Sequence, residues 1–358
     1  MVKNKLCIYN EEYKLNIKSE FKQPEHQCNR PINYPVLLLF DEYHSSIEGI
    51  DQSIETFLEI NSKIGIQIVG VEGYDGGIIW DTETGNYKVK DRFDINIVDS
   101  NGILNDTNAC GNQPRFAKGI KDEILTLGID SKGMCNKIET DCFDNNRDDQ
   151  DYIRNHPLQR ERSKHFILTL LKFWEQNTRK GYKIAALNCG RNHTTHIIQM
   201  HAKKEIANIS FQKLSIIRIT PNLPLVHFTT EDHYNAIKKT GFIVPKNQLN
   251  PNATGGDPSK VAAFKFFNYT NLDRVNEFKQ FFVNQKNNNP CGQNNLTKES
   301  IVGLLIDENA SDSIWEEFPN ENKELFFGGG LPTKNRYAYG IYVKTSTKVP
   351  ISAILGEI

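Results

Sequence analysis

The chain has 358 residues, of which 38% are hydrophobic and 24% are charged, as in ordinary globular proteins. Its 43 basic and 44 acidic side chains leave a net charge of -1, which gives no overall electrostatic signal for a nucleic acid or an anionic membrane as partner. No apolar run approaches the roughly 18 to 20 residues that cross a bilayer, so we expect no membrane span.

The N-terminal segment and the cysteines bear on where the protein works. Met1 to Ile8 starts basic but leads soon into Glu11 and Glu12, without the apolar core of a signal peptide. The seven cysteines are an odd number and include no Cys-x-x-Cys pair, which argues against a disulfide framework and a zinc knuckle. We expect reduced thiols in a protein that is cytoplasmic or that reaches a target cell by a route without a signal peptide.

The first predicted domain opens with two apolar runs on either side of a helical pattern. Val36 to Phe40 is a short continuous run, and Ile66 to Val71 is another. Between them, apolar residues recur at helical spacing from Ile50 to Ile64. The pattern predicts a strand, a helix and a neighbouring parallel strand, with both strands buried and joined by a right-handed crossover.

The segment from Tyr74 to Gln150 is less regular. It is dense in Gly, Asp and Asn, and only Ile120 to Leu127 has a clear helical pattern. We interpret residues 74–150 as an insertion that lies over the edge of the sheet.

Helices and strands alternate again after this insertion. A helix that begins near Pro157 precedes an apolar strand at Ile184 to Leu187, a helix at Thr194 to Lys204 and a strand at Leu214 to Ile219. The alternation predicts that residues 1–220 form an α/β domain with a mainly parallel sheet and flanking helices.

A turn-rich segment, Pro221 to Pro224, separates this domain from a second one. Short strands are predicted at Ile301 to Ile306, Tyr339 to Val343 and Ile351 to Leu355. Residues 221–358 are therefore predicted to form a smaller α+β domain.

Charged and imidazole side chains follow three of the predicted strands. Glu42 and His44 come after the first strand and, two residues apart in an extended segment, face the same way. Glu72 ends the second strand, and His193 follows the third, where a helix begins and its backbone N–H groups attract an anion. Because ligands and catalytic groups gather at the carboxyl ends of strands in open α/β sheets, we expect one shared pocket.

An arginine completes this set. The helix before the third strand begins with Arg160, Glu161 and Arg162. An inward guanidinium would stabilise the negative charge that develops on an acyl or phosphoryl oxygen. His196, one helical turn after His193, is expected at the surface rather than in the pocket.

The order of these motifs carries a resemblance. Glu-x-His after the first strand, Glu-Gly after the second, Arg-Glu-Arg on a helix and Gly-x-x-His-Thr after the third are similar to the erythromycin esterase, ChaN, TraB and Tiki superfamily, over roughly Pro35 to Pro221. The resemblance implies a hydrolase-type pocket with the candidate catalytic residues Glu42, His44, Glu72, Arg160 and His193. Arg162 competes with Arg160, and Asp41 stands where many members have Gly. Because members include ester hydrolases, proposed metal-dependent proteases and haem-binding proteins, the substrate is not fixed.

Two mechanisms are open for this pocket. Without a metal, Glu42 or His44 activates water while Arg160 and His193 hold the substrate oxyanion. With a metal, His44, His193 and Glu72 ligate a divalent ion that lowers the pKa of bound water. The first is favoured, because the histidines arrive singly rather than in a motif such as His-Glu-x-x-His.

A second group of residues lies at the start of the second domain. Leu225 to Thr230 is a short strand that carries His227, and Thr230 can cap a helix from Glu231 to Thr240 that stops at Gly241. This stretch, with its following Gly-Phe-Ile-x-Pro, resembles the opening of ADP-ribosyltransferases of the His-Tyr-Asp/Glu type, over Leu223 to Ile358.

The second resemblance implies an NAD site. In that family the His bonds the ribose of NAD, an aromatic side chain stacks on the nicotinamide, and a later acid orients the reacting sugar. His227 matches the first of these. The other candidates are Thr229 beside it, Tyr269 or else Tyr339 for stacking, and Glu357 or Asp307 for the acid.

Together the resemblances predict a bacterial toxin or effector-like enzyme with a hydrolase-type first domain and an NAD-dependent ADP-ribosyltransferase-type second domain. Its partner would be a protein or small-molecule substrate. The alternative is a binding protein that captures haem or a similar ligand through His44, His193 or Tyr74 and whose second domain recruits a partner.

Overall fold

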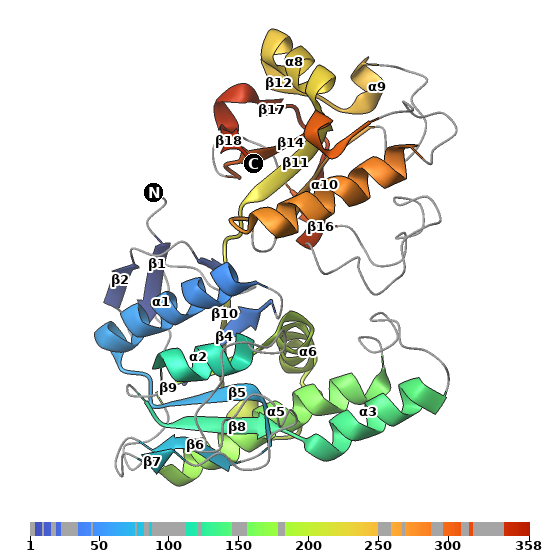
Figure 1. Ribbon diagram of the computed structural model, residues 1–358. Helices are drawn as coiled ribbons and strands as arrows, with labels where there is room; N and C mark the ends of the chain where they lie inside the picture. The colour runs from blue at the N-terminus through green and yellow to red at the C-terminus, as the bar shows by residue number, and fades with distance from the viewer. Residues whose placement is uncertain are drawn as a thin grey trace. The chain divides into compact units, whose positions relative to one another are not determined.

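The computed structural model describes residues 4–8, 11–15, 19–22, 35–43, 46–75, 77–81, 86–87, 112–120, 124–144, 156–177, 183–249, 259–266, 269–287, 296–308, 315–317 and 340–358 (Figure 1). The chain divides into two compact units, Met1–Asn222 and Leu223–Ile358, and each is described by itself. The division lies two residues beyond the expected boundary at residue 220.

The first unit is built on an eight-stranded sheet in the order β3-β10-β4-β9-β5-β8-β6-β7. Its strands are β3 (Glu20–Lys22), β4 (Val36–Glu42), β5 (Ile68–Asp75), β6 (Gly77–Asp81), β7 (Asn86–Tyr87), β8 (Thr126–Asp130), β9 (Ile184–Gly190) and β10 (Ser215–Thr220). The strands from β10 to β8 run parallel, and β3, β6 and β7 pair antiparallel at the two edges. The predicted α/β class with a mainly parallel sheet is confirmed.

Helices cover both faces of this sheet (Figure 1). One face carries α1 (Ile47–Ile64) and α2 (Asn112–Ile120), and the other carries α5 (Pro157–Asn177), α6 (Arg191–Ala202) and α7 (Ile209–Gln212). α3 (Lys132–Asp144) contacts α5, while β1 (Asn4–Ile8) and β2 (Glu11–Leu15) form a two-stranded sheet of their own.

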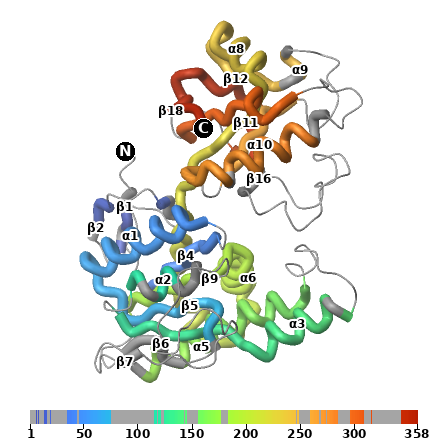
Figure 2. Tube along the Cα trace, in the orientation of Figure 1, coloured from blue at the N-terminus to red at the C-terminus, as the bar shows by residue number. Residues whose placement is uncertain are grey.

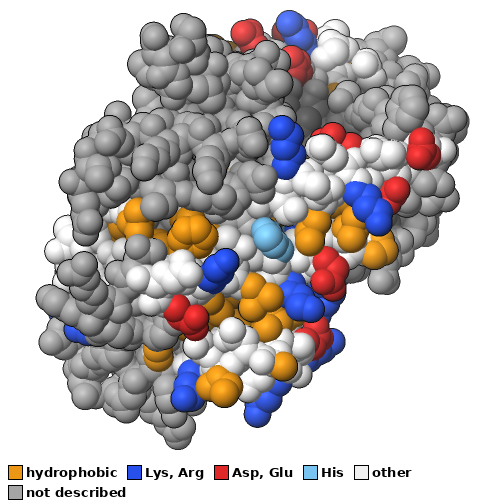
Figure 3. All heavy atoms as spheres, turned by 90° about the horizontal axis from the view of Figure 1, so that it is seen from below, with side chains coloured by type: hydrophobic (Ala, Val, Ile, Leu, Met, Phe, Trp, Pro, Cys, Tyr) orange, Lys and Arg blue, Asp and Glu red, His pale blue; other side chains and the backbone are white. Residues whose placement is uncertain are grey.

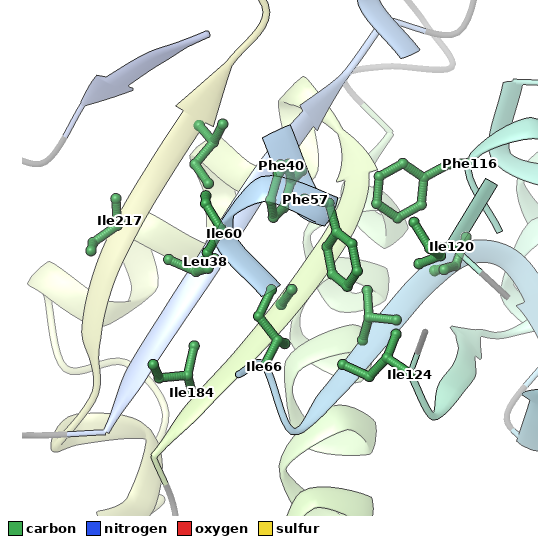
Figure 4. Packing of buried hydrophobic residues seen from close by; sticks show 14 of the residues in the cluster. Leu38, Phe40, Phe57, Ile60, Ile66, Phe116, Ile120, Ile124, Ile184 and Ile217 are labelled. Carbon is green, nitrogen blue, oxygen red and sulfur yellow. The ribbon is translucent and has the colours of Figure 1, made fainter. Parts of the chain in front are cut away.

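Aromatic side chains fill the core between the sheet and the first pair of helices (Figure 4). The ring centroid of Phe40 on β4 lies 5.9 Å from that of Phe57 on α1 and 6.1 Å from that of Phe116 on α2, and the last two are 5.8 Å apart. Tilted and edge-on pairs at such separations add about 0.5–1.5 kcal/mol each beyond their buried area. They hold α1 and α2 side by side on this face of the sheet (Figure 2).

Local sequence explains why β4 and α1 form. All seven residues of β4 are buried. A central strand that is covered on both faces needs apolar side chains on both faces, and the run Val-Leu-Leu-Leu-Phe supplies them. α1 begins after Ser46, whose side chain accepts the Gly49 N–H at 2.9 Å, and it ends at Gly65 with φ of 66°.

Two expectations about the first unit are wrong. β4 and β5 are not neighbours, because β9 lies between them and pairs with both. The expected helix at Ile120 to Leu127 is instead the end of α2 at Ile120 and the start of β8 at Thr126. The described part of residues 74–150 therefore supplies a strand to the parallel sheet and a helix to its cover, rather than only lying over its edge.

The second unit has a six-stranded antiparallel sheet in the order β15-β16-β13-β11-β14-β18. Its strands are β11 (Leu225–Thr230), β13 (Val261–Phe266), β14 (Ile301–Ile306), β15 (Glu316–Glu317), β16 (Gly340–Thr345) and β18 (Ile354–Glu357), and β12 (Phe242–Ile243) pairs separately with β17 (Val349–Pro350). The helices are α8 (Glu231–Thr240), α9 (Lys246–Leu249) and α10 (Leu272–Asn287), with single 3-10 turns at Lys298–Ser300 and Ile351–Ala353. α8 packs on one face and α10 on the other, as expected for a smaller α+β domain.

Within the described ranges, no helix is long and apolar enough to cross a membrane. In the view of Figure 3, Lys and Arg side chains lie beside Asp and Glu side chains, in keeping with the balanced charge of the sequence. Three cysteines of the described part, Cys135, Cys142 and Cys189, are free thiols.

Candidate active site

Four acidic side chains stand at the carboxyl ends of the parallel strands in the first unit. They are Asp41 and Glu42 on β4, Glu72 on β5 and Asp130 on β8, and none is more than 4% exposed. Because side chains alternate between the faces of a strand, Asp41 faces α5 and α6, whereas Glu42 faces α1 and α2. Charged side chains of the expected set therefore lie on both faces of the sheet at this edge and not in one pocket, because Glu42 faces α1 and α2 while Glu72 meets donors of α5 and α6.

Glu72 is the meeting point of three donors. Its Oε2 accepts the backbone N–H of Gly190 at 2.6 Å, at the start of α6. Its Oε1 lies 3.3 Å from Nη2 of Arg162 and 3.4 Å from Nε2 of His193. The expected anion-attracting N-terminus of α6 is thus met by a carboxylate of the protein itself.

Asp130 and Arg162 form the shortest ion pair of this site. Nη2 and Nε of Arg162 donate to the two carboxylate oxygens at 2.6 and 3.1 Å, and Nη1 donates to Gln159 at 2.7 Å. Asp130 also accepts the backbone N–H of Gly73 at 3.2 Å. Burial alone would lower the pKa of Arg162, but the charges of Asp130 and Glu72 raise it above its ordinary value, so the guanidinium stays charged.

Arg162, and not Arg160, joins the carboxylates. Arg160 lies on the outer side of α5, where its side chain is 34% exposed and pairs with Glu205 and Gln199. Two residues apart on a helix correspond to a rotation of about 200°, so the two arginines point in opposite directions. Of the two arginines proposed from the sequence, the fold therefore brings Arg162 to the site.

Asp41 connects three elements beneath the site. It accepts hydrogen bonds from Thr194 of α6 and from Thr220 of β10, and Nε of Arg218 lies 2.8 Å from its Oδ2. Nε of Arg191 is 4.0 Å from the same oxygen. Asp41 thus has a structural use, because it joins β4, β10 and the first turn of α6.

Glu42 lies across Gly190 from Glu72. Glu42 and Gly190 are register partners on β4 and β9, and Oε2 of Glu42 accepts Nδ2 of Asn188 at 2.9 Å. Within the described residues, Oδ1 of the buried Asn188 has no hydrogen-bond partner. A hydrogen-bond donor from a ligand at this edge could pair with that oxygen. His44 lies outside the described residues.

His193 and His196 meet at Ser163 on α5. The serine Oγ lies 2.8 Å from Nδ1 of His193 and 3.0 Å from Nδ1 of His196, and the ring of Phe166 packs 4.7 Å from that of His193. Burial and then the neighbouring charge of His193 lower the pKa of His196 from 6.5 to about 4, so His196 is neutral at physiological pH. It is half-buried rather than at the surface.

Two of the three expected metal ligands, His193 and Glu72, lie among the described residues. Among the described residues no three His, Cys, Asp or Glu side chains could hold a metal ion, and His44 of the expected set is not among them. Glu72, another expected ligand, already faces the guanidinium of Arg162, and that charge would repel a cation bound to the same oxygen. Burial raises the pKa of Cys189 well above its ordinary value, which keeps this nearby thiol protonated.

Sequence reasoning missed Asp130 and Ser163. Asp130 ends the unrecognised strand Thr-Leu-Gly-Ile-Asp, which has the same apolar-then-acidic pattern as β4. Ser163 and Arg162 belong to the buried stripe of α5 that continues through Phe166 and Leu170, and that helical phase is visible in the sequence.

In the second unit, His227 and Glu357 lie in one row. His227 of β11 is the register partner of Leu304 on β14, which in turn is the partner of Glu357 on β18. Directly opposite residues point to the same face, so His227 and Glu357 share a face about 10 Å apart, two strand spacings. Tyr234 of α8 donates its hydroxyl to Glu357, and this bond raises the pKa of the phenol.

The tautomer of His227 suits an acceptor role. Its Nδ1 lies 2.7 Å from the carbonyl oxygen of Ala262, which only accepts, so Nδ1 carries the proton and Nε2 of the neutral ring carries a lone pair. Such a lone pair can accept the hydroxyl proton of a ribose, so His227 fits the NAD that the resemblance implies. Thr229 is buried on the same face.

The expected stacking residue is not brought to this row. Tyr269 packs with Phe266 and Phe278 against the α10 side of the sheet, opposite to His227. Tyr339 lies outside the described residues. Asp307 follows β14, and its backbone N–H donates to Ala353 at 2.8 Å.

No model of a protein family, no curated protein and no solved structure matches this chain.

Proposed function

We propose that the first unit is a hydrolase that cleaves an ester or peptide bond with activated water. The observation that carries this proposal is the convergence of Arg162 Nη2 and His193 Nε2 on one carboxylate oxygen of Glu72 at 3.3 and 3.4 Å. Charge-assisted hydrogen bonds are ordinarily near 2.7–2.9 Å, so both donors are held close to, but not tightly on, an anionic oxygen. Catalytic hydrogen bonds are often long before substrate binds.

In this mechanism the two donors stabilise the oxyanion of the tetrahedral intermediate. Arg162 is fixed by Asp130 and Gln159, and His193 is fixed by Ser163, so neither has to reorganise during the reaction. Glu42, on the other side of Gly190, acts as the general base that takes a proton from water, and His44 is the alternative base. Glu42 faces α1 and α2, whereas Arg162 and His193 come from α5 and α6, so this mechanism requires a substrate that reaches over Gly190 at the end of β9.

The test uses the full chain with p-nitrophenyl esters and fluorogenic peptides as substrates. Glu42→Gln removes the base, and Arg162→Lys removes the fork geometry while keeping the charge. Loss of one oxyanion donor should lower kcat by about 100- to 1,000-fold. Arg160→Lys, two residues along the same helix, is the matched control and should leave turnover unchanged. Equal turnover in all four proteins, or none in the wild type, would overturn the proposal.

We propose further that the second unit is an NAD-dependent ADP-ribosyltransferase. The supporting observation is the row of His227 and Glu357 on one face, with an acceptor nitrogen on the histidine and Tyr234 holding the acid. When bound, NAD would supply the ADP-ribosyl group. In this proposal His227 bonds the ribose, and Glu357 orients the reacting sugar.

Labelled NAD and cell extracts test the second unit. Wild type should transfer label or hydrolyse NAD, and His227→Ala and Glu357→Ala should not. His233→Ala changes an exposed histidine of α8 and serves as the control. No transfer and no NAD turnover by the wild type would count against a transferase. With both activities, the chain would fit a toxin or effector that acts in a target cell.

Two of the three candidate haem ligands, Tyr74 and His193, lie among the described residues. Tyr74 is 1% exposed within the core cluster, and His193 is bonded to Ser163 and faces Glu72. Neither side chain is directed outward as an axial ligand would be.

A further inference from the structure

Ser163 faces three groups at once. Its Oγ lies 2.8 Å from the carbonyl oxygen of Gln159, 2.8 Å from Nδ1 of His193 and 3.0 Å from Nδ1 of His196. A hydroxyl has one proton to donate and two lone pairs to accept with. The serine is fully buried, so these three contacts are made inside the protein and not to solvent.

The contact of Nε2 of His193 with Glu72 limits which ring nitrogen can carry the proton. Nε2 of His193 is 3.4 Å from Oε1 of Glu72, and an ionised carboxylate only accepts. That contact is attractive only if Nε2 bears a proton. In the neutral ring Nδ1 is then an acceptor, and the group within hydrogen-bond distance of it that can supply a proton is the hydroxyl of Ser163.

His196 acts as a hydrogen-bond donor to Ser163 in this arrangement. It is neutral, because burial lowers its pKa to about 4, and its ring donates toward the backbone of Gln159. Nδ1–H of His196 can then also donate to a lone pair of Ser163, which leaves the serine proton for His193. In this arrangement His196 donates to Ser163, Ser163 donates to His193, and His193 donates to Glu72.

We propose that Ser163 is a positioning residue that holds neutral His193 as the Nε2–H tautomer, so that this histidine serves the site as a hydrogen-bond donor rather than as its general base. If His193 takes up a second proton, Nδ1–H donates to Ser163 and the serine hydroxyl turns to the Gln159 carbonyl. Nε2–H keeps its direction in both charge states. The catalytic use of this donor rests on the proposed hydrolase function, whereas the tautomer does not.

Nitrogen NMR of the full chain with 15N-labelled histidine tests the tautomer directly, because protonated and unprotonated ring nitrogens differ widely in chemical shift. His193 is assigned by comparison with His193→Gln. We expect a protonated Nε2 and an unprotonated Nδ1 in the wild type. Ser163→Ala should convert His193 partly or wholly to the Nδ1–H tautomer, and Ser163→Thr, which keeps the hydroxyl, should restore the wild-type pattern.

His156 gives an internal control in the same spectra. Its Nδ1 accepts the Leu158 N–H and its Nε2 lies 3.2 Å from Asp141, so its tautomer is independent of Ser163 and should stay unchanged. Thermal unfolding shows whether each variant folds, and Ser163→Cys replaces the threonine variant if threonine does not fit. A wild-type His193 with its proton on Nδ1, or an unchanged tautomer in Ser163→Ala, would overturn the inference.

The kinetic readout separates this inference from the proposed function. On an ester that the wild type cleaves, Ser163→Ala should lower kcat about 10- to 100-fold with little change in KM, because the donor is lost where the oxyanion forms. The expected tautomer without any hydrolysis would refute the hydrolase and leave the positioning role standing. Hydrolysis with the opposite tautomer would do the reverse.

Discussion

Replacing Arg162 by methionine tests whether the buried ion network holds the site together. The substitution keeps much of the side-chain volume and removes the guanidinium that donates to Asp130 at 2.6 and 3.1 Å. Asp130 is fully buried and Glu72 is 4% exposed, so both carboxylates would stay in the interior without this cation. Removing one partner of a buried ion pair costs about 3–5 kcal/mol.

The matched control is Arg160→Met, two residues away on α5. Its ion pair with Glu205 is about one third exposed on both sides, and such pairs contribute about 1 kcal/mol or less. In a unit of this size each kcal/mol corresponds to roughly 2–4 °C in Tm, so Arg162→Met should lower Tm by about 6–20 °C and Arg160→Met by a few degrees at most. Urea unfolding followed by fluorescence of the buried Trp174 gives the free energies.

The contribution of Arg162 to stability should also have a defined pH dependence. Because the folded-state pKa of Arg162 is raised, its stabilisation is fully present below its ordinary pKa and should not change between about pH 6 and about pH 9. Adding Asp130→Asn to Arg162→Met should recover part of the loss, because one buried charge is removed with its partner. Equal destabilisation by the two arginine variants would refute the reasoning.

Three further predictions concern packing, a thiol and a helix cap. Gly70→Ala should destabilise the first unit by about 1–3 kcal/mol in urea unfolding, because its Cβ would lie 2.7 Å from Cγ2 of Ile129, whereas Gly133→Ala meets only one atom, at 4.0 Å, and should not. Burial raises the pKa of the Cys135 thiol from 9.0 to about 12. Iodoacetamide should therefore label Cys135 at pH 8 about 1,000-fold more slowly in the folded protein than in the urea-unfolded chain. Similar labelling rates in the two states would contradict this prediction. Thr230→Ala removes the N-cap of α8 and should cost about 1 kcal/mol in the second unit, with no change in unfolding as the contrary result.

Strands that begin with a continuous apolar run were predictable from the sequence. β4 and β9 are continuous apolar runs, and the cap and stop of α8 follow from Thr230 and Gly241, whose φ is 78°. β8 was not found because its five residues are interrupted by Gly128 and follow a helix within a few positions. Without β8, Asp130 had no place in the site.

Residue pairs that depend on register or strand order could not be read from one sequence. β9 lies between β4 and β5, and Gly190 therefore lies between Glu42 and Glu72. No local pattern in the sequence encodes this strand order. The row of His227 and Glu357 likewise depends on the register of two strand pairings, where a slip of one residue would move a side chain to the other face. The choice of Arg162 over Arg160 was accessible, since Arg162 is in phase with the buried stripe of α5.

The central position of β9 has a consequence for how the protein is made on the ribosome. β5 ends at Asp75 and β9 at Gly190, so 115 residues separate the completion of two adjacent strands, or about 6 to 23 seconds at about 5–20 residues per second. During that interval the edges of β4 and β5 that pair with β9 in the folded sheet stay open. A fragment that stops before Ile184 should therefore depend on chaperones or aggregate, while a chain that includes β9 closes this gap once that strand emerges.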